Sequence, residues 1–146
     1  MSEKLKLEAF LPYRLNVLAT KVSQALAARY ESAYGLSIPE WRVLATLGQY
    51  GSVSAKEIAY HSQMDKIKVS RAVARLVDRG FLSRGRNASD RRMKDLTLSE
   101  KGHAVYLEIV PEARAYEEAL LEGMGKKDFD ALDRLILRLT EKAERL

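Results

Sequence analysis

The stretch SVSAKEIAYHSQMDKIKVSRAVARLVDRGF, residues 52–81, decides the fold because it encodes two short helices joined by a tight turn. Ser54 and Glu57 have the spacing of a capping box, which predicts the start of the first helix. The segment HSQM, residues 61–64, is expected to form the turn, and Asp65 is a suitable N-cap for the second helix. The sequence therefore predicts a helix-turn-helix in the middle of the chain.

The second of these helices has two different faces. Its inner face is apolar at helical spacing, with Val69, Val73 and Leu76. Its outer face carries cations and one hydroxyl group, from Lys68, Ser70, Arg71 and Arg75. Such groups suit the phosphate oxygens and guanine edges of a DNA major groove. A solvated helix face would explain each base taken alone, but the stripe as a whole favours DNA binding.

The residues after Gly80 predict a β-hairpin. Two runs with strand character, Phe81–Arg86 and Met93–Leu98, flank a polar loop that contains Gly, Asn and Ser. The segment SDRRMKD, residues 89–95, covers the end of this loop and the start of the second run, and it is either a solvated turn or a probe that reaches into a polyanion. Helix, turn, helix and hairpin in this order predict a mainly α fold with a small β-hairpin wing, which is a winged helix-turn-helix.

Two further helices are predicted before this segment. The first, LPYRLNVLATKVSQALAARYESAYG, residues 11–35, has a stop signal at Gly35. It carries one apolar stripe, made of Leu11, Leu15, Leu18, Val22 and Ala25. The second begins at SIPE, residues 37–40, where Ser37 and Glu40 form another capping box, and it ends at Gly51. Its expected buried residues are Trp41, Val43, Leu44 and Leu47.

Two helices are also predicted after the hairpin. Ser99 is expected to cap the first of them, and Pro111 either kinks this helix or marks a break in it. Asp128 is the expected cap of the last helix, DFDALDRLILRLTEKAERL, residues 128–146. This last helix carries a second apolar stripe, made of Phe129, Leu132, Ile136, Leu139, Ala143 and Leu146.

The two apolar stripes need a partner surface. Either stripe could line the core of a single chain, but the long first helix has only a small central domain to pack on. This imbalance favours an intertwined dimer. We therefore predict an N-terminal dimerisation helix in residues 1–35, a DNA-binding lobe in residues 36–103 and C-terminal dimerisation helices in residues 104–146.

Positive charge is concentrated in the middle of the chain. The formal net charge is +5, yet residues 51–103 alone hold twelve bases and six acids, a net charge of +6. The two ends together therefore sum to −1. A basic middle between nearly neutral flanks is typical of nucleic-acid binding, although a solvated surface can also be basic.

The composition argues against an enzyme and against a membrane protein. The 146 residues suit a single domain, and the lack of cysteine excludes disulfides and cysteine nucleophiles and suits the cytoplasm. The two histidines are far apart in sequence, and Glu57 with His61 would not make a metal site without further ligands. No apolar run approaches the roughly 20 residues that span a bilayer. We expect a cytoplasmic protein without catalytic residues, metal or cofactor.

Three segments resemble the multiple-antibiotic-resistance regulator (MarR) family: LSIPEWRVLATL, DKIKVSRAVARLVDRGFLSR and DRRMKDLTLSEKG. The resemblance covers nearly the whole chain. Its most specific part is the wing pattern D-x-R followed by L-T/S-x-x-G, which is matched by Asp90, Arg92, Leu98, Ser99 and Gly102. Members of this family are homodimers whose terminal helices intertwine, so the resemblance implies the same assembly here.

The resemblance also implies which residues contact DNA. The second helix of the motif would enter the major groove with Lys66, Lys68, Ser70, Arg71 and Arg75. In the wing, Arg92 would probe the neighbouring minor groove, Asp90 would orient it, and Arg91 would meet phosphate or solvent. Ile67 departs from the small polar residue usual in the family, and either packs on a thymine methyl or turns inward.

Family members commonly bind small aromatic anions in a crevice between the dimerisation helices and the DNA-binding lobe. The residues that could form such a pocket here are Tyr13, Arg14, Asn16, Trp41 and His61. Arg14 could pair with a carboxylate, or equally with an acid of the partner chain. Trp41 could instead belong to the core, and His61 could end its helix or contact DNA phosphate.

These observations predict a homodimeric transcriptional regulator that binds double-stranded DNA and responds to a small effector. We expect it to repress a palindromic operator and to be released by the effector, for which an aromatic carboxylate is one candidate. The alternative is an architectural protein that coats DNA through charge alone, without sequence preference.

Overall fold

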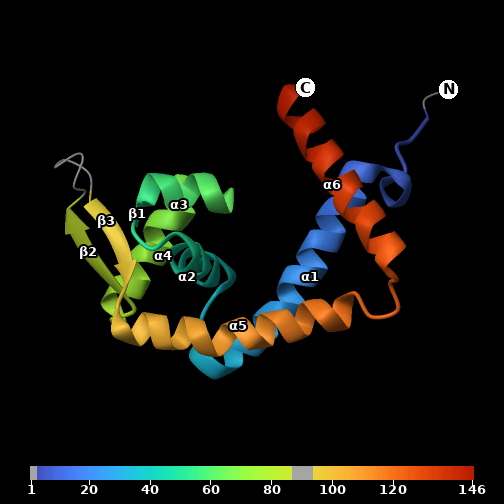
Figure 1. Cartoon of the computed structure of the whole chain (residues 1–146). Coiled ribbons are helices and arrows are strands. Elements are labelled where there is room, and N and C mark those ends of the chain that lie inside the picture. The colour runs from blue at the N-terminus through green and yellow to red at the C-terminus, as the bar shows by residue number, and fades with distance from the viewer. Residues whose placement is uncertain (1–2, 87–93) are drawn as a thin grey trace. The chain divides into compact units, whose positions relative to one another are not determined.

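The computed structural model describes residues 3–86 and 94–146 (Figure 1). Its elements, in chain order, are η1 (Leu7–Ala9), α1 (Leu11–Tyr34), α2 (Ile38–Tyr50), β1 (Val53–Ser54), α3 (Ala55–Ser62), α4 (Lys66–Asp78), β2 (Leu82–Arg86), β3 (Lys94–Leu98), α5 (Glu100–Leu120) and α6 (Lys126–Arg145). The chain divides into two compact units, Met1–Glu112 and Ala113–Leu146. The first unit contains the helix-turn-helix and the strands of the hairpin, so the predicted winged helix-turn-helix is confirmed.

The predicted capping boxes set the starts of α2 and α3. The Glu40 N–H donates to Ser37 Oγ at 3.3 Å, and the Ser37 N–H donates back to Glu40 Oε1 at 3.2 Å. Ser54 and Glu57 make the same pair of hydrogen bonds at 3.2 and 3.3 Å. Each box satisfies backbone donors that the first turn of a helix leaves unpaired. Both predicted helix starts are therefore confirmed.

One predicted helix cap differs from the structure. Helix α6 begins at Lys126 with Gly125 as its N-cap, so Asp128 lies inside the first turn and the predicted Asp128 cap is wrong. A carboxylate at that position still interacts favourably with the positive end of the helix dipole. Pro111 lies within α5 and does not divide it. Helix α1 ends as predicted at Gly35, which has a φ of +66°, a value that glycine adopts without steric cost.

The sheet is antiparallel and has the strand order β1-β3-β2. The predicted hairpin pairs β2 with β3 in the register Leu82 with Leu98 and Arg84 with Leu96. Strand β1 also pairs with β3, with Val53 opposite Leu96, and it was not predicted. Two residues are too short to show the alternating pattern of a strand. Because β1 directly precedes α3, this pairing attaches the wing to the helix-turn-helix.

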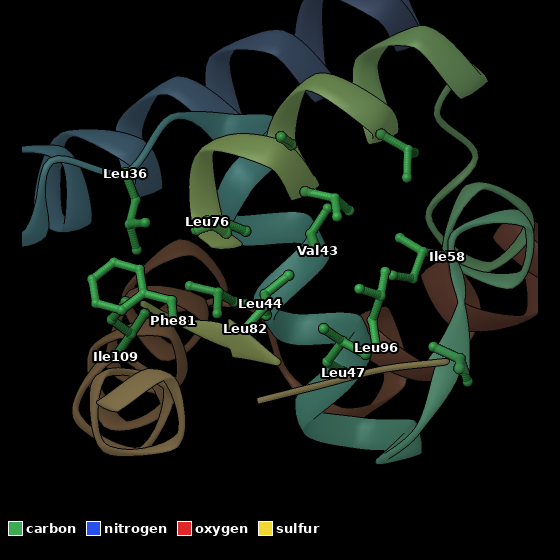
Figure 2. Close-up of a cluster of buried hydrophobic side chains, with 14 of the residues drawn as sticks. Leu36, Val43, Leu44, Leu47, Ile58, Leu76, Phe81, Leu82, Leu96 and Ile109 are labelled. Atoms are coloured by element: carbon green, nitrogen blue, oxygen red, sulfur yellow. The ribbon is translucent and has the colours of Figure 1, made fainter. Parts of the chain in front are cut away.

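The core lies where α2, α4, the hairpin and the first half of α5 meet, and Figure 2 shows its side chains. Its labelled members are Leu36, Val43, Leu44, Leu47, Ile58, Leu76, Phe81, Leu82, Leu96 and Ile109. Trp41 is only half-buried and packs between Tyr30 and Tyr106, with ring centroids 5.6 and 6.3 Å away. Burial raises the pKa of Tyr30 to about 12.

The apolar stripes of α1 and α6 do not belong to this core. The buried residues of α1 are Ala27 and Tyr30, near its C-terminal end. Leu11, Leu15 and Leu18 of the stripe are 46%, 47% and 58% exposed. No residue of α6 is buried, and its stripe is exposed along nearly its whole length. A single chain therefore leaves two apolar helix faces in contact with water.

Gly102 allows α5 to approach the hairpin closely, and we expect Gly102→Ala to destabilise the fold. A Cβ built on Gly102 would lie 2.0 Å from the Phe81 carbonyl oxygen. That oxygen already accepts a hydrogen bond from the Ser99 N–H at 3.0 Å, so the backbone has little freedom to retreat. We expect a loss of about 1–3 kcal/mol in the free energy of unfolding, measured by urea denaturation. Gly85→Ala, where an added Cβ meets nothing within 4 Å, is the matched control. Equal stabilities of the two variants would contradict the prediction.

Candidate nucleic-acid interface

Helix α4 buries apolar side chains on one face and exposes cationic side chains on the other. Its buried residues are Val69, Ala72, Val73 and Leu76. The predicted contact residues are all exposed: Lys66, Lys68, Ser70, Arg71 and Arg75. The Asp65 carboxylate accepts a hydrogen bond from the Lys68 N–H at 2.8 Å and fixes the start of the helix. The helix thus presents its cations away from the core on a rigid support.

Helix α3 adds one cation that the sequence interpretation did not assign to the site. An open hollow of about 280 Å³ lies between the first turns of α3 and α4, and is lined by Ala55, Lys56, Lys66, Val69 and Ser70. Lys56 and Lys66 therefore border one concave surface from two different helices. Lys56 lies two residues after the Ser54 cap, in the first turn of α3, and this position was the available sequence signal.

Arg75 has a second role that the sequence interpretation did not include. Its Nε atom lies 3.7 Å from Oε1 of Glu40, and Nη1 of Arg79 lies 3.9 Å from Oε2 of the same carboxylate. Glu40 is only 5% exposed, and a buried carboxylate needs such partners. The Arg75 side chain is still half exposed, so it is oriented by Glu40 while it remains accessible. The sequence had indicated Glu40 only as part of a capping box.

Arg79 joins the end of α1 to the end of α4. Its guanidinium donates hydrogen bonds to the carbonyl oxygens of Tyr34 at 2.6 Å and Gly35 at 3.1 Å. The same group lies 4.7 Å from the centre of the Phe81 ring. Arg79 therefore connects α1, α2 through Glu40, and the start of the hairpin. Together with Glu40 it fixes the orientation of α4 relative to these elements.

The predicted wing residues Asp90, Arg91 and Arg92 lie outside the described residues, so their roles stay predictions. Ile67 is described, and it is 64% exposed on α4. Of the two alternatives for Ile67, an inward orientation is therefore wrong. It faces solvent because Val69, Ala72 and Val73 already occupy the buried side of the helix.

The five predicted effector residues do not form one pocket within a single chain. Tyr13 and Arg14 line an open groove of about 380 Å³ on α1 with Glu8, Val17, Leu18 and Lys21. Asn16 is exposed on the same helix, and Trp41 contacts Tyr30, seventeen residues further along α1 than Tyr13. At 1.5 Å per residue this is roughly 25 Å along the helix axis, too far for one small ligand. His61 stacks on Tyr50 with ring centroids 4.0 Å apart, in the last turn of α3.

A second, smaller cavity lies between α1 and α5. It has a volume of about 50 Å³ and is lined by Leu26, Arg29, Tyr30, Ala33, Tyr34, Ile109 and Glu112. The Tyr34 hydroxyl donates a hydrogen bond to the Glu108 carboxylate, and this bond raises the pKa of Tyr34. The volume suits a few water molecules rather than an aromatic acid. Sequence periodicity could not have indicated this cavity, because it depends on how two distant helices cross.

Metal sites and membrane spans are both absent from the described residues, 3–86 and 94–146. Among them no group of three or more His, Asp or Glu side chains is placed to hold a metal ion. Within the same part of the chain, no helix combines the length and the apolar character needed to cross a bilayer.

A helix-turn-helix with a cationic second helix and an attached hairpin defines the class of winged-helix DNA-binding regulators. The MarR family model matches residues 36–94. The HTH-type transcriptional repressor Rv2887 of Mycobacterium tuberculosis is 30% identical over 113 residues, which are 77% of this chain and 78% of that protein. The chain belongs to the MarR family.

Solved structures agree with this assignment. A MarR/EmrR family transcriptional regulator from Acinetobacter sp. ADP1 has a TM-score of 0.88 at 25% identity, covering 97% of this chain and 100% of that one. BpsR of Bordetella bronchiseptica, whose DNA binding is regulated by 6-hydroxynicotinic acid, has the same fold, with a TM-score of 0.82 at 20% identity and coverage of 94% and 98%. The family consists of transcriptional regulators, so this chain is a DNA-binding transcriptional regulator and not an enzyme.

Proposed function

We propose that this regulator acts as a homodimer that binds a palindromic operator through α4 of each protomer. The observation that carries the proposal is the outer face of α4, where five polar or cationic side chains are exposed opposite a fully apolar inner face. A dimer would place two such helices about one DNA turn apart, roughly 34–36 Å. Because the proposed partner is chromosomal DNA, we also place the protein in the cytoplasm.

The exposed apolar stripes support a second copy of the chain as the dimer partner. Leu11, Leu15 and Leu18 on α1, with Leu132, Ile136 and Leu139 on α6, are between 38% and 58% exposed. Contiguous apolar helix faces of this kind are typical of surfaces that become buried on association. Residues 1–35 and 104–146 would then be dimerisation segments, and residues 36–103 the DNA-binding lobe.

Within the DNA-binding lobe, each proposed contact residue has a distinct role toward DNA. Lys66, Lys68, Ser70 and Arg71 would face the major groove, and Lys56 would reach a backbone phosphate beside the hollow between α3 and α4. Arg75 would contact DNA while Glu40 holds its Nε side. From the wing, Arg92 would enter the minor groove, oriented by Asp90, with Arg91 near phosphate.

We further propose that the protein is a repressor that a small ligand releases. The name of the relative Rv2887 and the effector of BpsR support this part of the proposal. An aromatic carboxylate would suit the groove beside Tyr13 and Arg14, where a guanidinium is available next to apolar side chains. In the dimer, Asn16, Trp41 and His61 would contribute only if the partner chain brings them to that groove. Such a ligand weakens DNA binding to the extent that it prefers a dimer with altered helix spacing.

A competition experiment separates this function from the architectural alternative. The intergenic DNA beside the gene is the source of the operator fragment, and a shuffled sequence of equal length is the competitor. We expect the operator to bind at least about a thousandfold more tightly at physiological salt. A ratio near one, together with a steep fall in affinity as salt rises, would instead show binding through charge alone.

A further inference from the structure

Ile67 is an exposed aliphatic side chain in the middle of a cationic surface. It is 64% exposed, and its chain neighbours on α4 are Lys66 and Lys68. Single exposed apolar residues are common on protein surfaces, so exposure alone means little. The position is what matters, since Ile67 is the second residue of α4. The N-terminal residues of a recognition helix are the ones that reach base edges in the major groove.

Helix geometry places Ile67 among the residues already assigned to DNA. Ser70 and Arg71 follow it at i+3 and i+4, so their side chains lie on the same side of α4 as Ile67. All three are exposed, whereas Val69, Ala72 and Val73 are buried against the lobe. Ile67 therefore has no packing role in the core that would explain an aliphatic side chain at this position. A surface that contacts Ser70 and Arg71 therefore also lies next to Ile67.

We propose that Ile67 reads the C5-methyl group of a thymine in each operator half-site. This inference rests on the proposed function and adds a specificity-determining residue to it. An isoleucine side chain has no hydrogen-bonding group, so the polar base edges of the major groove offer it nothing. The thymine methyl is the apolar group that the major groove presents, and contact with it removes both surfaces from water. The neighbouring cations Lys66, Lys68 and Arg71 would bind the DNA backbone and so hold the base close enough for that contact.

A double replacement, in protein and in DNA, tests the inference. The operator is first selected from random DNA with the unmodified protein, and each thymine of a half-site is then replaced symmetrically by deoxyuridine, which lacks only the methyl group. We expect one position at which the unmodified protein loses about fourfold in affinity per half-site, or roughly fifteenfold for both. The Ile67→Ala variant should bind both DNAs equally, with the affinity that the unmodified protein has for the deoxyuridine operator.

Four results would overturn the inference. If deoxyuridine is tolerated at every position, or if Ile67→Ala remains as sensitive as the unmodified protein, Ile67 reads no thymine although the regulator function stands. If the unmodified protein selects no operator over random DNA, the proposed function fails and this inference fails with it. Thermal unfolding of Ile67→Ala should match that of the unmodified protein, because an exposed side chain is truncated. A lower Tm would show that Ile67 has a structural role instead.

Discussion

The double variant Ile136→Lys with Leu139→Lys is expected to dissociate into monomers and to lose at least about a hundredfold in operator affinity. Both side chains are exposed in the single chain, at 53% and 44%, on a helix without any buried residue. Two lysines placed inside a buried dimer interface would carry unpaired charge there, which costs several kcal/mol. A monomer contacts one half-site, so the second set of DNA contacts is missing entirely. Sedimentation velocity and a DNA titration at fixed salt measure the two effects.

The matched control is Glu141→Lys. It changes the charge of α6 by the same +2 units, but helix geometry places Glu141 on the side away from Ile136 and Leu139. This variant should remain a dimer and should bind the operator at least as tightly, because added positive charge favours DNA. Circular dichroism should show unchanged helix content in both proteins. A double variant that stays dimeric would refute the assignment of the α6 stripe to the dimer interface.

Arg71→Ala is expected to cause the largest loss of operator affinity among single substitutions on α4. Arg71 is exposed beside Ser70 and makes no ion pair with any residue that the structure describes. An arginine that binds DNA contributes about 1–3 kcal/mol, and a dimer uses it twice, so the expected effect is roughly 2–6 kcal/mol. This corresponds to at least about thirtyfold in Kd. If Arg71 binds a phosphate, the salt dependence of binding should also become less steep, by about one unit for each arginine removed.

Arg134→Ala is the control for loss of a positive charge. Arg134 lies on α6, on the side away from the apolar stripe, and its removal should change operator affinity by less than about threefold. Arg75→Ala should behave differently from both, because it also removes a partner of the buried Glu40 carboxylate and should therefore lower stability. Equal affinities of the Arg71→Ala and Arg134→Ala proteins would show that Arg71 does not contact DNA.

Local signals explain why so much of the fold could be predicted. The starts of α2 and α3 follow from Ser37 with Glu40 and from Ser54 with Glu57, pairs that are only three residues apart. The two faces of α4 follow from a helical period within a single element. The exposed contact residues of the site depend on that same period, so their orientation was also predictable.

Features that depend on distant contacts could not be predicted in this way. The carboxylate of Glu40 meets Arg75 and Arg79 only because α2 packs on α4, and no sequence spacing indicates that contact. Strand β1 is two residues long and exists because β3 pairs with it. The predicted effector residues were chosen for their side-chain chemistry. In the structure, Tyr13 lines a groove near the start of α1, whereas Trp41 packs on Tyr30 near the end of the same helix.

The hydrogen bonds of Arg79 have a mechanical consequence. Because they join the C-terminal end of α1 to the end of α4, we expect α4 to turn together with that end of α1. Helix α1 has 24 residues and is therefore about 36 Å long, so a shift of about 3 Å at its far end corresponds to a tilt of about 5°. We expect a ligand that displaces the N-terminal end of α1 to change the orientation of α4 without touching the DNA.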